Sequence, residues 1–128
     1  SRIERLTKPY GAAVLLSGAV RDRLRDPGRF TLREVGRVRA KGKREPVTVH
    51  EVLDARGDEM AGLVAALPSF STGLSAWYAG DFEEAKAGFG EAVDIAQVDQ
   101  LAGDYLHRID ELTNAPADWD GVDHRESK

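Results

Sequence analysis

The sequence predicts an α+β protein, in which a basic half of short helices and strands precedes an acidic half built of helices. The apolar pattern changes near Ala55 from alternation, typical of strands, to a spacing of three and four, typical of helices. The charge changes sign at nearly the same place. Residues 1–50 contain 13 Lys and Arg against 5 Asp and Glu, whereas residues 51–128 contain 5 against 17, within a net charge of −4. We therefore expect two modules with different roles.

The basic half is predicted to run helix, strand, helix, strand, strand. The signals cover, in order, residues 1–8, 12–16, 17–26, 30–41 and 47–53, with a basic turn over 42–46. Ser17 is a suitable N-cap for the second helix, and Pro9 and Pro27 stop the two helices. Three strands and two short helices are little material for a core, so the sheet is expected to be incomplete.

Side-chain alternation predicts two different faces for the 30–41 strand. One face is expected to be mainly apolar, with Phe30, Leu32, Gly36, Val38, Ala40 and the single charged residue Glu34. The other carries Val35 and a basic row made of Arg33, Arg37, Arg39 and Lys41. The arginines of this row either cover the sheet through their alkyl stems or meet acidic groups of a missing half or a partner. Gly36 in mid-strand favours a β-bulge.

The acidic half is predicted to be helical. Its segments are a short amphipathic helix over 56–67 that ends at Pro68, a helical stretch over 71–97 and a helix over 98–113. The last helix carries an apolar stripe made of Leu101, Tyr105, Ile109 and Leu112. Residues 114–128 are polar and rich in turn residues, so we expect an extended or loosely docked tail.

Two motifs of the basic half resemble the C-terminal part of a class III nucleotide cyclase catalytic domain. The stretches SRIERLTKPYGAAVLLSGAVRDRL and FTLREVGRVRAKGKREPVTVHEVL follow one another in the family's order, and their most specific pieces are SRIE, GRVRAKGK and PVTVHEVL. This resemblance implies a partial ferredoxin-like cyclase sheet in residues 1–54. A helical extension in residues 55–113 and a polar C-terminal tail in residues 114–128 would follow it.

The resemblance also implies two site residues. Arg2 matches an arginine that stabilises the transition state, and Lys41 matches a lysine that binds the triphosphate. Both roles suit the chemistry, because attack of the ribose 3′-oxygen on the α-phosphate builds charge that fixed cations stabilise. A guanidinium offers planar, bidentate contact to phosphate, whereas lysine acts as a compact point charge.

Other parts of the family's active site are expected outside this chain. The asparagine that accompanies the arginine, the two metal-binding aspartates and the purine-reading residues would all precede Ser1. Enzymes of the family use Mg²⁺ or Mn²⁺ and build each site between two protomers. We expect a homodimeric parent that converts ATP to 3′,5′-cyclic AMP and pyrophosphate, and a 128-residue chain that binds no metal and is inactive alone. The preference for ATP over GTP rests on the family only.

The stretch GLSAWYAGDFEEAKAGFGEAV is similar to a single tetratricopeptide repeat. The matching residues are Gly73, Gly80, Asp81, Phe82, Ala85, Phe89 and Ala92, whereas Ala76 replaces a large aromatic residue and Trp77 stands one place off. The small residues would let two helices approach closely. One repeat cannot bury its own face, so we expect the 98–113 helix to cap it. The resulting platform is expected to take a protein partner.

The alternative hypothesis is a non-enzymatic binding module, in which a basic α/β unit is joined to a helical platform that docks peptides. Nucleic acid is not an expected partner, because no helix-turn-helix, zinc or aromatic RNA-binding signature accompanies the basic row. His50 is expected to pack, and His107 and His124 lack metal-ligand spacing, so no metal site is predicted. Trp77 and Trp119 are expected in core or docking contacts.

Composition bears on the compartment. The chain has no cysteine, which excludes disulfides and favours a reducing compartment. No apolar run approaches the roughly 20 residues of a membrane helix, and no secretory h-region is visible. We expect a cytoplasmic protein, whose parent could be anchored to a membrane through other segments. The first residue is not methionine, so a processed chain or part of a longer one is expected.

Overall fold

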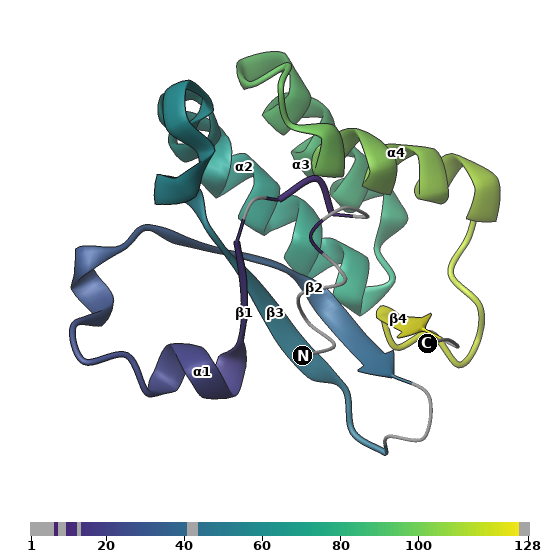
Figure 1. Ribbon diagram of the computed structural model, residues 1–128. Helices are drawn as coiled ribbons and strands as arrows, with labels where there is room; N and C mark the ends of the chain where they lie inside the picture. The colour runs from purple at the N-terminus through teal and green to yellow at the C-terminus, as the bar shows by residue number, and fades with distance from the viewer. Residues whose placement is uncertain (1–6, 8–9, 13, 41–43, 126–128) are drawn as a thin grey trace. The chain divides into compact units, whose positions relative to one another are not determined.

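The structure, a computed structural model, describes residues 7, 10–12, 14–40 and 44–125 (Figure 1). The chain forms two compact units: a sheet unit of residues 1–57 and 122–128, and a helical unit of residues 58–121. It passes between them at Gly57 and Gly121, both with positive φ (62° and 71°), a conformation that favours glycine. The predicted α+β class is confirmed.

Within the described residues, four strands form the sheet, in the order β1-β3-β2-β4. β2 (Leu32–Ala40) and β3 (Val47–Val52) form an antiparallel hairpin, and β1 (Leu15–Ser17) pairs antiparallel with β3. β4 (Val122–Arg125) pairs parallel with β2. Since β4 follows the helical unit in sequence, an edge of the sheet is supplied by a segment that sequence analysis treats as a polar tail.

The helices of the sheet unit are short. Ser17 caps α1 (Gly18–Asp22), because its side-chain oxygen accepts a hydrogen bond from the backbone N–H of Val20 at 3.2 Å. The helix ends earlier than predicted, and a 3₁₀ turn, η2 (Pro27–Arg29), follows it. A second 3₁₀ segment, η3 (Leu53–Glu59), leads out of β3. The predicted first helix falls almost wholly outside the described residues.

A β-bulge in β2 changes which side chains share a face. The register with β3 shifts between Glu34 and Gly36, where the mid-strand glycine favours a bulge. Leu32 pairs with an even-numbered residue of β3, whereas Gly36 and Val38 pair with odd-numbered ones. Leu32 therefore lies on the opposite face from Gly36 and Val38. The prediction of one continuous apolar face is wrong, because the extra residue reverses the alternation.

The same bulge divides the predicted basic row. Arg33 pairs across the sheet with Glu51 on the buried face, together with Val35 and Val38. Arg37 and Arg39 lie beyond the bulge on the other face and are only partly buried. The prediction of one basic row is wrong for this reason, and Lys41, its last expected member, lies outside the described residues.

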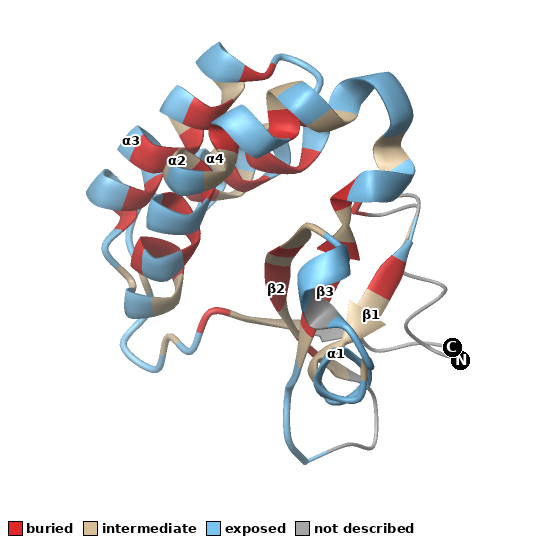
Figure 2. Ribbon diagram, turned by 90° about the vertical axis from the view of Figure 1, so that its left-hand side faces the viewer, coloured by how far each residue is buried: buried red, intermediate tan, exposed pale blue. Residues whose placement is uncertain are grey.

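Three helices form the helical unit: α2 (Met60–Ala79), α3 (Phe82–Ile95) and α4 (Gln100–Leu112). Gly80 ends α2 in the left-handed conformation (φ 81°), and the next residue, Asp81, caps α3 by accepting from the Glu84 N–H at 3.2 Å. Asp99 caps α4 in the same way, accepting from the Ala102 N–H. The buried residues of each helix gather on the sides that face the other helices (Figure 2).

Pro68 does not end a helix, contrary to the prediction, but lies inside α2. A proline there has no N–H to donate to the carbonyl of Val64. Both Pro68 and Val64 are exposed, so water can hydrate that carbonyl. Packing of the buried side of α2, which includes Phe70 and Trp77, outweighs the local preference for a break.

Glycine lets α2 and α3 approach closely at one point. A Cβ added to Gly88 would lie 2.5 Å from the backbone nitrogen of Gly73, which is closer than real Cβ atoms come to a backbone. Beside this contact, the ring of Phe89 meets Phe70 of α2 edge-to-face at 5.3 Å and stacks on Tyr105 of α4 at 4.8 Å. Aromatic packing from all three helices therefore makes the core of the helical unit.

Candidate functional site

The two site residues expected from sequence, Arg2 and Lys41, both lie outside the described residues. The structure therefore neither brings them together nor separates them. It does describe the framework from which Lys41 continues, since Ala40 is the last residue of β2. It also describes Tyr10, in the segment that follows Arg2 along the chain.

Charge divides sharply between the two units. Sixteen Lys and Arg stand against nine Asp and Glu in the sheet unit (+7), and two against thirteen in the helical unit (−11), which together give the net charge of −4. The sheet unit therefore suits an anionic ligand, and the helical unit a cationic one. The charge difference between residues 1–50 and 51–128, noted from the sequence, is close to the difference between the two units. The two divisions differ little, because only residues 51–57 and 122–128 change sides.

His50 is buried on the same face of the sheet as Arg37. Its Nε2 lies 3.2 Å from Nη1 of Arg21 in α1. An arginine can only donate, so Nε2 accepts and the ring is neutral, with its proton on Nδ1. Burial lowers the pKa of His50, the charge of Arg21 lowers it further, and the carboxylates of Glu34 and Asp22 oppose this. No partner for Nδ1 is found among the described residues.

The packing role expected for His50 is confirmed by its burial, with only 4% of the residue exposed. Its contact with Arg21 is a feature that sequence reasoning missed. The two residues are 29 positions apart, and no spacing rule connects a short helix to a strand at that separation. Only the sheet pairing brings β3 beside the segment of β1 and α1.

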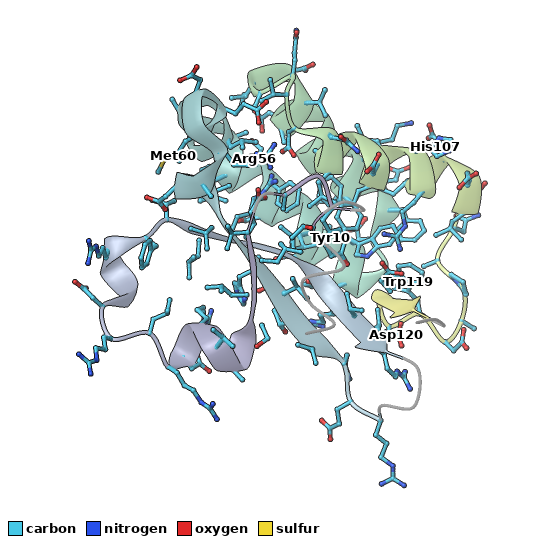
Figure 3. The ribbon with its side chains drawn as sticks, in the orientation of Figure 1. Tyr10, Arg56, Met60, His107, Trp119 and Asp120 are labelled. Carbon is cyan, nitrogen blue, oxygen red and sulfur yellow. The ribbon has the colours of Figure 1, made fainter. Side chains whose placement is uncertain are left out.

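An ion-pair triad lies on the opposite, buried face. Arg33 donates to Oε1 of Glu51 at 2.8 Å, and Arg56 donates to Oε2 of the same carboxylate at 2.5 Å (Arg56 is labelled in Figure 3). Exposed side-chain fractions are 1% for Arg33, 0% for Glu51 and 9% for Arg56. Neither alternative that the sequence left for Arg33 applies, because its acidic partner stands on the neighbouring strand of the same sheet.

The end of β2 that leads to Lys41 is held by β4. Pairing of β2 with β3 extends to Val38 and Val47, whereas pairing with β4 runs from Arg37 to Ala40. In addition, Tyr10 Oη donates to Oδ2 of Asp123 at 3.5 Å. β4 thus contacts both the residues that precede Lys41 and the segment that follows Arg2.

In the helical unit, residues 113–121 after α4 form a segment that we call the Trp119 strap. Trp119 donates from Nε1 to the carbonyl of Trp77 at 2.6 Å, and Trp77 donates from Nε1 to the carbonyl of Gly121 at 3.3 Å. The Trp119 ring also meets the rings of Trp77 (4.8 Å) and Phe82 (5.2 Å) edge-to-face. The expected core or docking contacts of these tryptophans are confirmed.

Two shallow grooves run along α3. The groove between α2 and α3 is lined by hydroxyl side chains, including Ser71 and Ser75, and by the carboxylates of Asp81 and Glu84. The groove between α3 and α4 has a mixed lining that includes Phe82 and Lys86. The carboxylates of Asp81 and Glu84 would complement a basic segment at the groove between α2 and α3.

Within the described part of the chain, no group of three or more His, Asp or Glu side chains is placed to hold a metal ion. The Mg²⁺ or Mn²⁺ that the family resemblance implies therefore finds no fitting ligand set among the described residues. No helix in that part of the chain is long and apolar enough to cross a membrane. Comparisons with protein-family models, curated proteins and solved structures find no match to this chain.

Proposed function

We propose that the sheet unit is the C-terminal part of a class III nucleotide cyclase domain, whose homodimeric parent converts ATP to 3′,5′-cyclic AMP and pyrophosphate for intracellular signalling. One observation carries the proposal. The motif GRVRAKGKREPVTVHEVL coincides with the β2–β3 hairpin, whose register pairs Val38 with Val47. Lys41 follows the last residue of β2 in the sequence, in the basic stretch between the two strands, at the position that the family resemblance gives to the triphosphate-binding lysine.

In this proposal each cation has a separate task. Arg2 stabilises the charge that develops on the α-phosphate during attack by the ribose 3′-oxygen. Lys41 holds the triphosphate through a charge-assisted hydrogen bond. Mg²⁺ or Mn²⁺ would supply Lewis-acid stabilisation of the same phosphates, held by aspartates outside this chain. We therefore expect the 128-residue chain alone to be inactive, so that incubation with ATP and Mn²⁺ would yield no cyclic nucleotide.

The test is kinetic and uses the full-length parent. Arg2→Ala is expected to lower kcat by about a hundredfold or more, because its contact strengthens in the transition state. Lys41→Ala is expected mainly to raise KM for ATP, since it removes a contact present in the bound substrate. Arg44→Ala, an exposed residue of the same turn, is the matched control with near-wild-type kinetics. Near-normal activity in both test variants would refute the assignment.

The second candidate is a non-enzymatic module in which the helical unit, resembling a single tetratricopeptide repeat, docks a peptide. The charge of −11 on the helical unit and the carboxylates beside the α2–α3 groove favour it. A fluorescent Lys- and Arg-rich peptide is then expected to bind, and Glu84→Gln with Asp81→Asn to weaken binding. Glu111→Gln, on an exposed site outside both grooves, is the control. A peptide that binds all variants equally would oppose this candidate.

A further inference from the structure

The Trp119 strap lies on two aromatic rings of the helical unit that are nearly parallel to each other. Trp77 of α2 and Phe82 of α3 stack at 5.4 Å with an interplanar angle of 13°. The Trp119 ring (labelled in Figure 3) stands across both, at 86° to Trp77 and 87° to Phe82. Its Nε1 donates to the Trp77 carbonyl at 2.6 Å. We call the two rings together with this carbonyl the indole site.

The indole site is built by the helices and not by the strap. Trp77 is also held from α4, because Tyr105 meets its ring edge-to-face at 5.1 Å and the guanidinium of Arg108 lies 4.7 Å from its centroid. Phe82 stacks on Trp77 without the strap taking part. These contacts remain when the strap leaves, so the indole site is preformed for another indole.

The strap begins at a strained residue. Thr113 has φ 67° and ψ −53°, and the N–H of Asn114 donates to the carbonyl of Leu112 at 2.7 Å. This is the positive-φ form of the γ-turn, which is rare and strained, and a β-branched residue suits it poorly. Among the described residues, Thr113 is the one non-glycine residue with positive φ. Opening of the strap releases this strain, so the turn is suited to act as a hinge.

The hinge and the indole site meet at the groove between α3 and α4, because Thr113 and Phe82 both line it. The groove also contains the carboxylates of Glu83 and Asp110, against the amine of Lys86. The helical unit as a whole carries a charge of −11. A segment that enters the groove is therefore favoured when it is cationic.

We propose that the indole site and the α3–α4 groove bind a basic peptide that contains a tryptophan, and that the Trp119 strap competes with this peptide from within the chain. The indole of the peptide donates to the Trp77 carbonyl in place of Trp119. A peptide carbonyl two residues further accepts from Trp77 Nε1, as that of Gly121 does in the closed strap. The lysines or arginines of the peptide face Glu83 and Asp110.

This inference does not rest on the cyclase assignment. It also concerns a different surface from the second candidate function, since the α3–α4 and α2–α3 grooves share no lining residue. Failure of either proposed function therefore leaves the experiments below decisive for the indole site.

Fluorescence anisotropy with the 128-residue chain tests the competition. The probe is the fluorescein-labelled, amidated peptide TNAPAKWKG, which is the strap sequence with lysine at the positions of Asp118 and Asp120. Trp119→Ala is expected to bind it about tenfold more tightly than the wild type, because the competing indole is gone. The peptide TNAPAKAKG, without the indole, is expected to bind Trp119→Ala at least about tenfold more weakly than the probe. Equal affinities in either comparison would overturn the proposal.

The wild-type chain tests the displacement without relying on the fold of Trp119→Ala. The chain has two tryptophans, so its isotope-labelled form gives two indole N–H signals in a nuclear magnetic resonance spectrum. Loss of one signal in Trp119→Phe assigns it. A saturating amount of the unlabelled probe peptide is expected to move the Trp119 signal to the position of a solvent-exposed indole. An unmoved Trp119 signal would overturn the proposal.

The hinge is tested by two adjacent glycine substitutions. Thr113→Gly relieves the strain of the closed strap, so the probe is expected to bind about threefold more weakly than to the wild type. Asn114→Gly adds similar backbone freedom at a residue without positive φ, and is not expected to weaken binding. Equal effects of the two variants would overturn the role of Thr113 as hinge.

The choice of groove is tested by two adjacent glutamates, both exposed near the start of α3. Glu83 lines the α3–α4 groove and Glu84 lines the α2–α3 groove. Glu83→Gln is expected to weaken binding of the probe by about threefold, as for the loss of one exposed charge pair, and Glu84→Gln to leave it unchanged. The reverse result would place the peptide in the α2–α3 groove and overturn the proposal.

Discussion

At the scale of single residues, Glu51 is a carboxylate fully buried between two guanidinium groups. Replacing it by Gln removes the negative charge that faces Arg33, whose side chain is 1% exposed. We expect the free energy of unfolding to fall by about 3–5 kcal/mol, the usual cost of breaking a buried pair from one side. Urea unfolding measures this.

The matched control for Glu51 is an exposed ion pair in the helical unit. Lys86 and Asp110 lie 4.0 Å apart with side chains 66% and 69% exposed. Asp110→Asn is expected to change the free energy of unfolding by less than about 1 kcal/mol. If Glu51→Gln and Asp110→Asn lowered the free energy of unfolding by the same small amount, the ion-pair triad would contribute little to stability.

His50 predicts a dependence of stability on pH. Burial and Arg21 hold its pKa below the ordinary 6.5, so the unfolded chain binds this proton more readily than the folded chain. The contribution of neutral His50 to the free energy of unfolding is therefore fully present above pH 6.5. It falls as the pH drops below 6.5, by at most about 1.4 kcal/mol per pH unit. The fall ends at the folded-state pKa.

Urea unfolding at pH 7.5 and 5.5 measures this loss. The variant His50→Gln is expected to remove this part of the pH dependence, because glutamine can accept from Arg21 without titrating in this range. His107→Gln is the control, since its side chain is 75% exposed. An unchanged pH slope in His50→Gln would show that other groups produce it.

At the scale of elements, Gly88 and Gly90 of α3 form a matched pair. A Cβ on Gly88 would meet the backbone of Gly73, whereas a Cβ on Gly90 would meet nothing within 4 Å. Gly88→Ala is expected to destabilise the protein by about 1–3 kcal/mol through overpacking. Gly90→Ala is expected to stabilise it by about 0.5–1 kcal/mol, because alanine favours the helix. Thermal unfolding distinguishes the two variants. Equal shifts of their melting temperatures would contradict the close approach of α2 and α3 at Gly88.

Elements could be predicted where a local signal decides them. Ser17 as a cap and Gly36 as a bulge site are both found, since each depends on neighbouring backbone only. The bulge also turns Arg33 to the buried face of the sheet. Predicting this requires the register between β2 and β3, which the sequence of β2 alone does not give. Pro68 inside α2 likewise depends on which side of the helix is exposed, which the sequence alone does not give.

The candidate site shows the same limit. Arg2 and Lys41 come from a resemblance of motifs, and the described residues do not include them. β4 was not predictable, because VDHR has no clear alternation and its pairing with β2 spans the whole helical unit. Contacts such as Arg21 with His50 require the sheet order, which non-local pairing fixes.

At the scale of the whole molecule, the end of the helical unit can be tested directly. The sequence places the end of the helical extension at residue 113, whereas the compact helical unit runs to Gly121 and includes Trp119. A polypeptide of residues 58–121 keeps both hydrogen bonds between the tryptophan side chains and the backbone, and one of residues 58–113 loses them. The 58–113 polypeptide also loses the edge-to-face contacts of Trp119 with Trp77 and Phe82.

We expect the 58–121 polypeptide to unfold cooperatively and the 58–113 polypeptide to be less stable by about 2–4 kcal/mol, from two hydrogen bonds and two aromatic contacts. Thermal unfolding followed by circular dichroism measures the difference. A third polypeptide, residues 58–121 with Trp119→Ala, separates the indole from the rest of the strap and should fall close to the shorter chain. Equal stability of all three would mean that the strap lies on the helices without stabilising them.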